Sequence, residues 1–125
     1  MVKVSGARAI IESLKLHDVD TIFGIISIHT LDIYDILASE QDELKFIGGR
    51  QELGVGFMAD GYARASNGPG VMLAGQNGPG ATHLITGIAQ AKAAFSPVVS
   101  IAGSFSTKDK MEDAFQGLDQ QSLFR

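Results

Sequence analysis

The sequence of 125 residues contains no cysteine, which excludes disulfide bonds and metal sites built on thiolates. The absence of cysteine also fits the cytoplasmic location that we expect for the protein. No apolar run reaches the length of a membrane span, and the first residues lack the long apolar stretch of a secretory signal peptide. With a formal net charge of -4, the chain lacks the basic surface of a nucleic-acid-binding protein. We therefore expect neither a membrane nor a nucleic acid among its partners.

Residues for metal binding and for serine catalysis are also scarce. His17, His29 and His83 are far apart in the sequence and have no paired carboxylates beside them, so we predict no metal site. A structural or solvated role is the simpler interpretation of each histidine, although His29 and His83 fall where a substrate could touch them. Ser27 and Ser104 lack the G-x-S-x-G context of a serine nucleophile. We therefore expect neither metal-centred nor serine-based catalysis from these residues.

Short apolar runs alternate with longer helical segments along the whole chain. The hydrophobic fraction of 45% and the charged fraction of 19% are typical of a globular protein, and residues 1–125 suffice for one domain. The predicted strands are 21–24, 44–47, 71–74 and 97–102, the last two of them buried, and the predicted helices run from Ser5 to about His17, over 31–37, from Glu52 to about Asn67, over 81–96 and over 111–115. This alternation predicts an α/β fold with three layers, in which a parallel sheet is covered by helices on both faces.

Many of the 15 glycines lie at junctions where a predicted strand ends and the next segment begins. The junctions are 24–30, 48–52, 75–80 and 103–116. The carboxyl ends of parallel strands meet at one edge of a sheet, and that edge is where such folds bind their ligands. We therefore expect the four junctions to surround a ligand site, with glycine allowing tight turns close to the ligand.

The stretch from Phe46 to Arg64 is the most informative part of the sequence. Two glycines are followed by Arg50, Gln51 and Glu52, where a helix that is apolar nearly all round begins, so we expect this helix to be buried in a core or an interface. A carboxylate in the first turn of a helix is favoured by the helix dipole. Among apolar neighbours, however, a carboxylate is costly without a partner. Glu52 therefore either complements the dipole or is held in a pocket to bind a ligand.

Residues 54–59 match the G-x-G-x-x-A pattern of dinucleotide-binding folds, which leaves a nucleotide-dependent oxidoreductase as one alternative. The match is weak, because these glycines fall inside the predicted helix rather than in the turn that follows a strand. We expect the small residues Gly54, Gly56 and Ala59 to allow close packing of another helix instead. Asp60 is interpreted as a solvated charge of the same helix.

Four motifs at compatible spacing resemble the pyrimidine-binding (PYR) domain of thiamine-diphosphate-dependent enzymes, in the acetolactate-synthase-like branch. Phe23-Gly-Ile resembles the end of the first strand of that family. Arg50-Gln-Glu52 and Ala59-Asp-Gly-Tyr-Ala-Arg64 resemble its Arg-His-Glu helix start and its Ala-Asp-Gly-Tyr-Ala-Arg run. Asn77-Gly-Pro-Gly-Ala-Thr82 resembles its Ser-Gly-Pro-Gly-Ala-Thr turn. Ala114-Phe-Gln116 and Asp119-Gln120 resemble the segment ahead of its final elements.

The resemblance implies that Glu52 hydrogen-bonds N1′ of the aminopyrimidine ring of thiamine diphosphate and so activates the cofactor. The further cofactor-binding residues that it implies are Gly24, Ile26, Asn77, Gly78, Pro79 and Gly80. The residues expected on the substrate side are Ser27, His29, Gln76, Phe115 and Gln116. The implied function is that of the pyrimidine-binding part of a lyase or carboligase, such as an acetolactate synthase or a 2-oxoacid decarboxylase, that acts on a 2-oxoacid or a similar carbonyl compound.

The chain also departs from the pattern of that family. Ile26-Ser27 replaces the usual Pro-Gly, and Gln51 replaces the usual His before the catalytic Glu. No Gly-Asp-Gly…Asn motif is present, so the resemblance implies that Mg²⁺ and the diphosphate are held by a different domain, in the same polypeptide or in a partner subunit of a homodimer or tetramer. The chain stops at Arg125, before the helix and strand that usually complete a PYR domain. We therefore expect no catalysis by this chain alone, and the alternative is a non-catalytic PYR-like module that pairs with a partner chain.

Overall fold

The computed structural model describes residues 3–108 and 114–125, and its helices and strands alternate as the sequence predicts. Its elements are α1 (Gly6–Leu16), β1 (Thr21–Gly24), the 3₁₀ turn η1 (Ile28–Thr30), α2 (Leu31–Ser39), β2 (Lys45–Gly48), α3 (Glu52–Ser66), β3 (Gly70–Ala74), α4 (Pro79–Ala93), β4 (Val98–Ala102) and α5 (Gln120–Leu123). The helix predicted over 111–115 lies mostly outside the described residues. Its last two residues, Ala114 and Phe115, belong to a turn that is closed by the Gly117 N–H on the Ala114 carbonyl oxygen.

The helix ends follow from local chemistry. The Ser5 side chain accepts a hydrogen bond from the Arg8 N–H at 3.1 Å and so caps the first turn of α1. Asn67 ends α3 in the left-handed conformation with φ 56°, which Asn tolerates better than most residues. Helix α4 begins at Pro79, two residues before the predicted start, because proline fits the first turn, where its missing N–H needs no partner.

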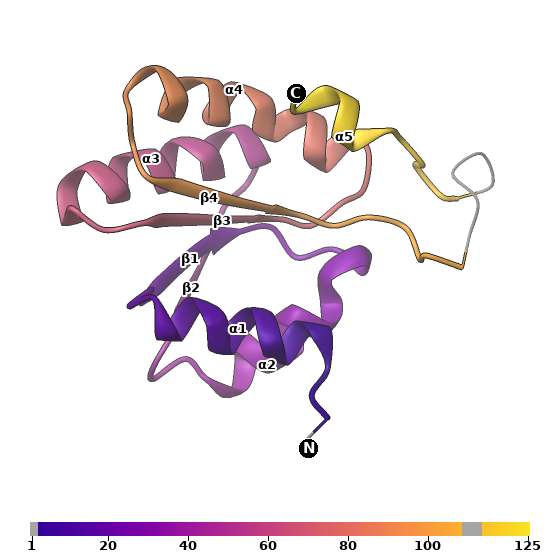
Figure 1. Cartoon of the computed structure of the whole chain (residues 1–125), viewed down its shortest axis with the longest axis horizontal. Coiled ribbons are helices and arrows are strands. Elements are labelled where there is room, and N and C mark those ends of the chain that lie inside the picture. Colours follow the sequence, from indigo (N-terminus) through magenta and orange to yellow (C-terminus); the bar gives the residue numbers. More distant parts are fainter. Residues whose placement is uncertain (1–2, 109–113) are drawn as a thin grey trace.

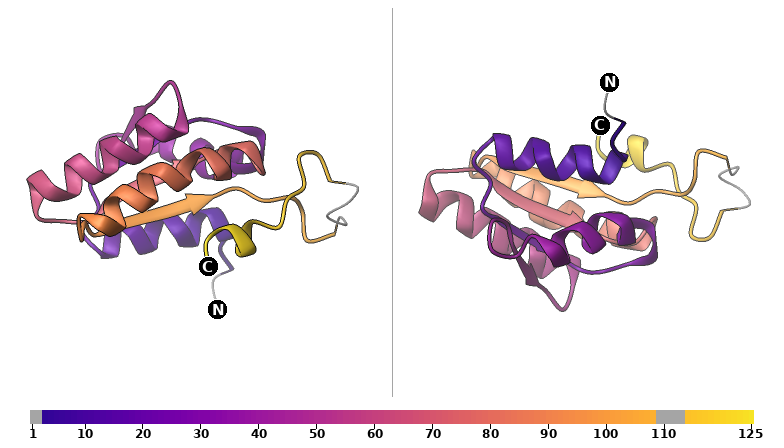
Figure 2. Two further views of the ribbon diagram at one scale, coloured as in Figure 1. Left: turned by 90° about the horizontal axis from the view of Figure 1, so that it is seen from above. Right: turned by 90° about the horizontal axis from the view of Figure 1, so that it is seen from below.

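The four strands form one parallel sheet with the order β2-β1-β3-β4. Helices α1 and α2 lie on one face of this sheet, and α3 and α4 lie on the other (Figure 1). The views from above and below show the same division into a sheet and two helical layers (Figure 2). The predicted α/β fold with a covered parallel sheet is therefore confirmed.

Alternate residues of the central strands supply the two halves of the core. On one side, Ile22, Val71 and Leu73 pack with buried side chains of α1 and α2. On the other side, Phe23 and Met72 pack with α3 and α4. Because successive side chains of a strand point to opposite faces, a continuous apolar run such as β3 serves both cores at once.

Helices α3 and α4 approach each other through glycine. A Cβ atom built on Gly56 would lie 2.8 Å from the Gly87 Cα, and one on Gly87 would lie 2.6 Å from the Gly56 Cα, both too close for a side chain. The predicted close packing of a helix is therefore confirmed at Gly56. At Gly54 it is wrong, because a Cβ there would meet nothing within 4 Å.

Two other predictions are wrong. Strand β4 is not buried, because it pairs only with β3 among the described residues, and Val99 and Ser100 are exposed. Asp60 is not a solvated charge, since only 4% of the residue is exposed. Its carboxylate accepts a hydrogen bond from the Ser96 hydroxyl and lies 3.5 Å from the Arg64 guanidinium. Both partners compensate for the loss of water around a buried charge.

Candidate functional site at the carboxyl edge of the sheet

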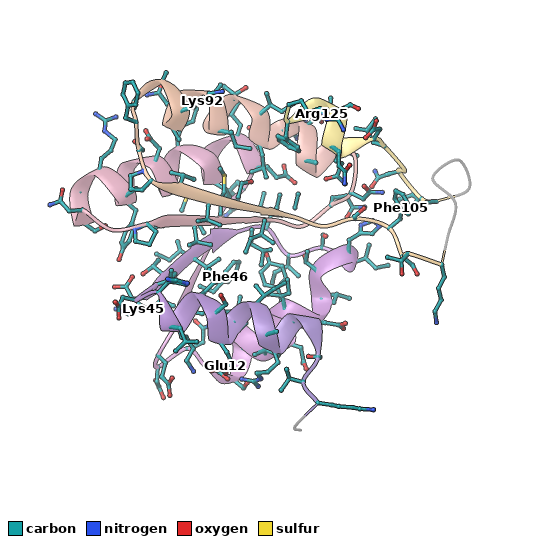
Figure 3. The ribbon with its side chains drawn as sticks, in the orientation of Figure 1. Glu12, Lys45, Phe46, Lys92, Phe105 and Arg125 are labelled. Atoms are coloured by element: carbon teal, nitrogen blue, oxygen red, sulfur yellow. The ribbon has the colours of Figure 1, made fainter. Side chains whose placement is uncertain are left out.

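The segments that follow the strands gather at one edge of the sheet, as the sequence predicts. After β1, the Ile25 N–H donates to the Leu73 carbonyl oxygen. After β2, the Gly49 N–H donates to the Gly24 carbonyl oxygen. After β4, the Gly103 N–H donates to the Ala74 carbonyl oxygen. In Figure 3, Phe105 lies toward this edge, while Lys45 and Lys92 lie toward the opposite one. These hydrogen bonds continue the ladder beyond the strands and fix where each turn begins.

Glu52 is the first residue of α3, and its half-buried side chain faces the start of α4. Its Oε2 lies 3.3 Å from Nδ1 of His83. A Cβ built on Gly80 would lie 3.4 Å from its Oε1. The side chain of Glu52 is 13% exposed, so the carboxylate has few contacts with bulk water. The structure thus places an ionisable group in a restricted space between two helix starts, where both helix dipoles favour a negative charge.

Tyr34 of α2 lies behind this edge and ties two strand ends together. Its hydroxyl donates to the Ile25 carbonyl oxygen at 2.8 Å and lies 3.2 Å from that of Leu73. Burial raises the pKa of the Tyr34 hydroxyl far above its usual range, and the negative charge of Glu52 raises it further. A Cβ on Gly24 would lie 2.6 Å from the same hydroxyl, so packing explains the glycine at this position.

The turn at 75–80 brings backbone close to its neighbours. Gly78 has φ +63°, and a Cβ there would lie 2.5 Å from the Gln116 carbonyl oxygen. A Cβ on Gly80 would lie 3.0 Å from the Cβ of Gln76. Pro79 is exposed at the start of α4. Glycine is required at Gly78 both by the backbone conformation and by the lack of space.

Most residues predicted on the substrate side are brought together. The ring of His29 stacks on that of Phe115 with centroids 6.4 Å apart, and the Gln76 amide donates to the Gln116 side-chain oxygen. Ser27 is also close to this turn, and its hydroxyl oxygen is buried with no hydrogen-bond partner among the described residues. Ile26, which was predicted on the cofactor side, is 60% exposed.

Sequence reasoning assigned no definite role to His83 and missed those of Tyr34 and Gln120. The contact between His83 and Glu52 joins residues 31 positions apart, which no local pattern reveals. The spacing from Gly80 to His83 does carry a signal, because residues three apart on a helix share a face. Gln120 donates to the Asn77 side-chain oxygen across 43 positions, and its segment has no periodic pattern that would place it there.

The candidate site offers several polar groups that an organic ligand can contact. The described residues include no group of three His, Cys, Asp or Glu side chains that could hold a metal. They do offer a half-buried carboxylate, a glycine turn with no room for a side chain, and the Ser27 hydroxyl, which has no partner among them. These are polar groups of the kind that orient a small organic ligand. Within the same residues, no helix has the length and apolar character needed to cross a bilayer.

Comparison with known proteins identifies the family of the chain. Residues 4–123 match the family model described as thiamine pyrophosphate enzyme, N-terminal TPP binding domain. The chain is 43% identical over 119 residues to an acetolactate synthase of Arthrospira platensis, covering 94% of this chain and 20% of the relative. It is 43% identical over 121 residues to a probable acetolactate synthase large subunit of Methanocaldococcus jannaschii, covering 97% and 20%. Against the mitochondrial acetolactate synthase catalytic subunit of Saccharomyces cerevisiae, identity is 38% over 124 residues, covering 99% and 18%. The chain therefore spans about a fifth of the length of these relatives.

Proposed function

The chain belongs to the thiamine pyrophosphate enzyme family, whose N-terminal TPP-binding domain it matches, and from this premise we propose that it is the pyrimidine-binding part of a lyase or carboligase. The observation that carries the proposal is the position of Glu52. Its half-buried carboxylate faces Gly80 from the first turn of α3, beside a turn that only glycine can form. A ligand ring beside Gly80 would meet the Glu52 carboxylate, with the side chains of His83 and Gln76 close by.

In this proposal, Glu52 holds a proton at the N1′ atom of the pyrimidine. A carboxylate with little access to water shares a proton with a ring nitrogen more readily than a solvated one does. His83, whose Nδ1 lies 3.3 Å from Glu52 Oε2, orients the carboxylate. The glycines of the 75–80 turn let the backbone approach the ring and exclude water from it. Bound thiamine diphosphate would supply the electron sink for breaking or forming a bond at a carbonyl carbon.

We further propose that the substrate is a 2-oxoacid or a related small carbonyl compound. It would bind on the side of the site formed by His29, Gln76, Phe115 and Gln116. The names of the relatives make acetolactate formation the first reaction to assay. Mg²⁺ and the diphosphate would be bound by a second domain, in the same polypeptide or in a partner subunit of a dimer or tetramer. On this proposal, the 125-residue chain alone has no turnover.

The decisive experiment compares Glu52→Gln with Glu43→Gln in the full-length protein. Both changes convert a carboxylate to an amide, but Glu43 lies on the exposed surface, where it pairs with Lys15. We expect Glu52→Gln to lower turnover with thiamine diphosphate and Mg²⁺ by about 10²-fold to 10⁴-fold, the range for losing a general acid–base group. Glu43→Gln should leave turnover unchanged. Wild-type turnover in Glu52→Gln would contradict the proposal. A wild-type protein that binds a partner chain but never turns over would instead support a non-catalytic PYR-like module.

A further inference from the structure

Asn77 is a polar residue with no solvent exposure, and it lies where several segments of the strand-end edge meet. Its backbone N–H donates to Nδ1 of His29 at 3.2 Å. Its side-chain nitrogen lies 3.5 Å from the Phe115 carbonyl oxygen, and its side-chain oxygen accepts a hydrogen bond from Gln120. Buried side-chain amides usually have their hydrogen bonds satisfied. Through these bonds, Asn77 fixes the segments that carry His29, Phe115 and Gln120 relative to one another.

Gln120 extends the same connection to the end of β4. Its side-chain nitrogen donates both to Asn77 and to the Gly103 carbonyl oxygen, the latter at 2.9 Å. Gly103 in turn leaves no room for a side chain, because a Cβ there would lie 2.9 Å from the Cβ of His29. We call the pair of side chains Asn77 and Gln120 the amide clasp. It joins the turn after β3, the end of β4 and the start of α5.

The amide clasp holds two residues that face the proposed substrate. Phe115 is stacked on His29 with an interplanar angle of 11°, and the Gln116 side chain accepts from Gln76. The Gln116 carbonyl oxygen lies directly over Gly78. Phe115 is 69% exposed, and it is contacted by the His29 ring and, at its carbonyl oxygen, by the Asn77 side chain.

We propose that the amide clasp is a positioning device that sets Phe115 and Gln116 relative to the cofactor turn, and so determines which 2-oxoacid is preferred. This inference rests on the proposed function. A serine at position 77 is too short to reach both Phe115 and Gln120, so asparagine gives this chain a connection that the serine of the similar motif cannot make. Gln120, unlike Asn77, is not among the residues that the resemblance assigns to the cofactor, and its side chain bonds only to Asn77 and Gly103 in the described residues. A change at Gln120 should therefore leave cofactor affinity unaffected.

The test uses the full-length protein with Asn77→Ser, Gln120→Met and the double variant. Gln120→Met keeps the size of a partly exposed side chain and removes only its hydrogen bonds, so it should fold even if a change at the buried Asn77 does not. Gln121→Met is the matched control, because Gln121 is exposed and next in sequence.

The first measurement is hydrogen exchange of the backbone amides of residues 114–120 without cofactor or substrate. Each single variant should exchange there about five-fold to ten-fold faster, as expected when one or two hydrogen bonds that oppose local opening are lost. The double variant should be no faster than the faster single variant, because the two side chains act as one unit. Unchanged exchange in Gln120→Met, or equal acceleration in Gln121→Met, would overturn the clasp.

The second measurement is the ratio of kcat/KM for a small and a larger 2-oxoacid, together with the affinity for thiamine diphosphate. We expect the ratio to change by about ten-fold in either clasp variant, and in Gln120→Met we expect cofactor affinity to stay within about two-fold of wild type. An unchanged ratio of kcat/KM together with weaker binding of the cofactor would show a merely structural role and overturn the proposal. If the wild type neither binds the cofactor nor turns over a 2-oxoacid, the proposed function fails as well. The exchange result would then still show whether the clasp exists.

Discussion

The layer formed by α1 and α2 (the α1–α2 layer) packs on the sheet through large apolar side chains. In the layer formed by α3 and α4 (the α3–α4 layer), the two helices contact each other at glycines, which have no side chain. Ile11 and Leu37 are almost completely buried against β1 and β3. Gly56 and Gly87 instead bring the backbones of α3 and α4 into contact. The two layers therefore respond to opposite changes, since the first is damaged by removing atoms and the second by adding them.

This difference matters because Glu52, Gly80 and His83 all lie on the α3–α4 layer. A backbone contact fixes the spacing of two helices more tightly than flexible side chains do, because it offers no rotamers to adjust. The distance from Glu52 to the start of α4 is thereby set by the fold itself. The α1–α2 layer reaches the site through the Tyr34 hydroxyl and the turn that carries His29.

The largest effect is expected from removing volume in the α1–α2 layer. Ile11→Ala should lower the free energy of unfolding by about 2–5 kcal/mol, because Ile11 is fully buried and its neighbours cannot close the cavity. Ile11→Val should cost about 0.5–1.5 kcal/mol. Urea unfolding of the two variants provides the measurement. Equal losses in both would show that the cavity does not govern this layer.

Adding one methyl group to the α3–α4 contact is expected to cost about 1–3 kcal/mol. Gly56→Ala places a Cβ 2.8 Å from the Gly87 Cα, so the two helices must move apart. Gly54→Ala is the control in the same helix, where the Cβ meets nothing within 4 Å, and alanine should stabilise the helix by about 0.5–1 kcal/mol. The comparison fails if both alanines shift the melting temperature in the same direction.

A smaller loss, about 1 kcal/mol, is expected for Tyr34→Phe, which removes the buried hydroxyl that joins Ile25 to the α1–α2 layer. Tyr62→Phe on the other face should cost less, because the Tyr62 hydroxyl bonds to the exposed carboxylate of Asp20 and water can replace it. Thermal unfolding of both variants under identical conditions tests the order. A larger loss for Tyr62→Phe would reverse our assignment of the buried bond.

The smallest effect concerns the charges that link α1 to α2. Lys15 and Arg8 donate to Glu40, and these hydrogen bonds hold the pKa of Glu40 below its ordinary value of 4.5. A carboxyl group with a lowered pKa stabilises the folded state above its unfolded pKa, and this contribution is lost as the pH falls through the folded pKa. Glu40→Gln should therefore lower the melting temperature slightly at pH 7.

At a pH well below 4.5, wild type and Glu40→Gln should melt at the same temperature, since the wild-type carboxyl is then protonated too. High salt at pH 7 should also shrink the difference, because exposed ion pairs are screened. A difference that persists in acid would assign the effect to packing of the side chain instead of its charge.

Local chemistry made most of the fold predictable. Ser5, Asn67 and Gly78 act within their own turns, so their roles can be assigned from the sequence alone. The apolar run of β4 resembles that of β3, and only the strand order reveals that β4 lies at an edge. An apolar run reports that a strand is favourable but not how many neighbours it has.

The site was predictable where a motif carried it and not where distant residues meet. Gly78 and Gly80 could be assigned to a tight turn from the sequence. In the structure, Gly78 lies beside Gln116, and Gly80 lies beside Glu52. The burial of Asp60 depends on Ser96, which lies 36 positions away, so its helix alone suggests a solvated charge. The amide clasp is hidden for the same reason, because neither of its residues is unusual in its own segment.

The exposed edge of β4 has a practical consequence for samples of this chain. Within the described residues, the outer side of β4 pairs with no strand, and residues 98–102 carry no charge. An uncharged free edge is a template for intermolecular sheet growth, which proteins usually prevent with lysine, proline or a covering segment. The edge strand on the other side, β2, begins with Lys45 and is therefore better protected. In samples of these 125 residues, we therefore expect aggregation to involve β4 and Val99→Lys to reduce it.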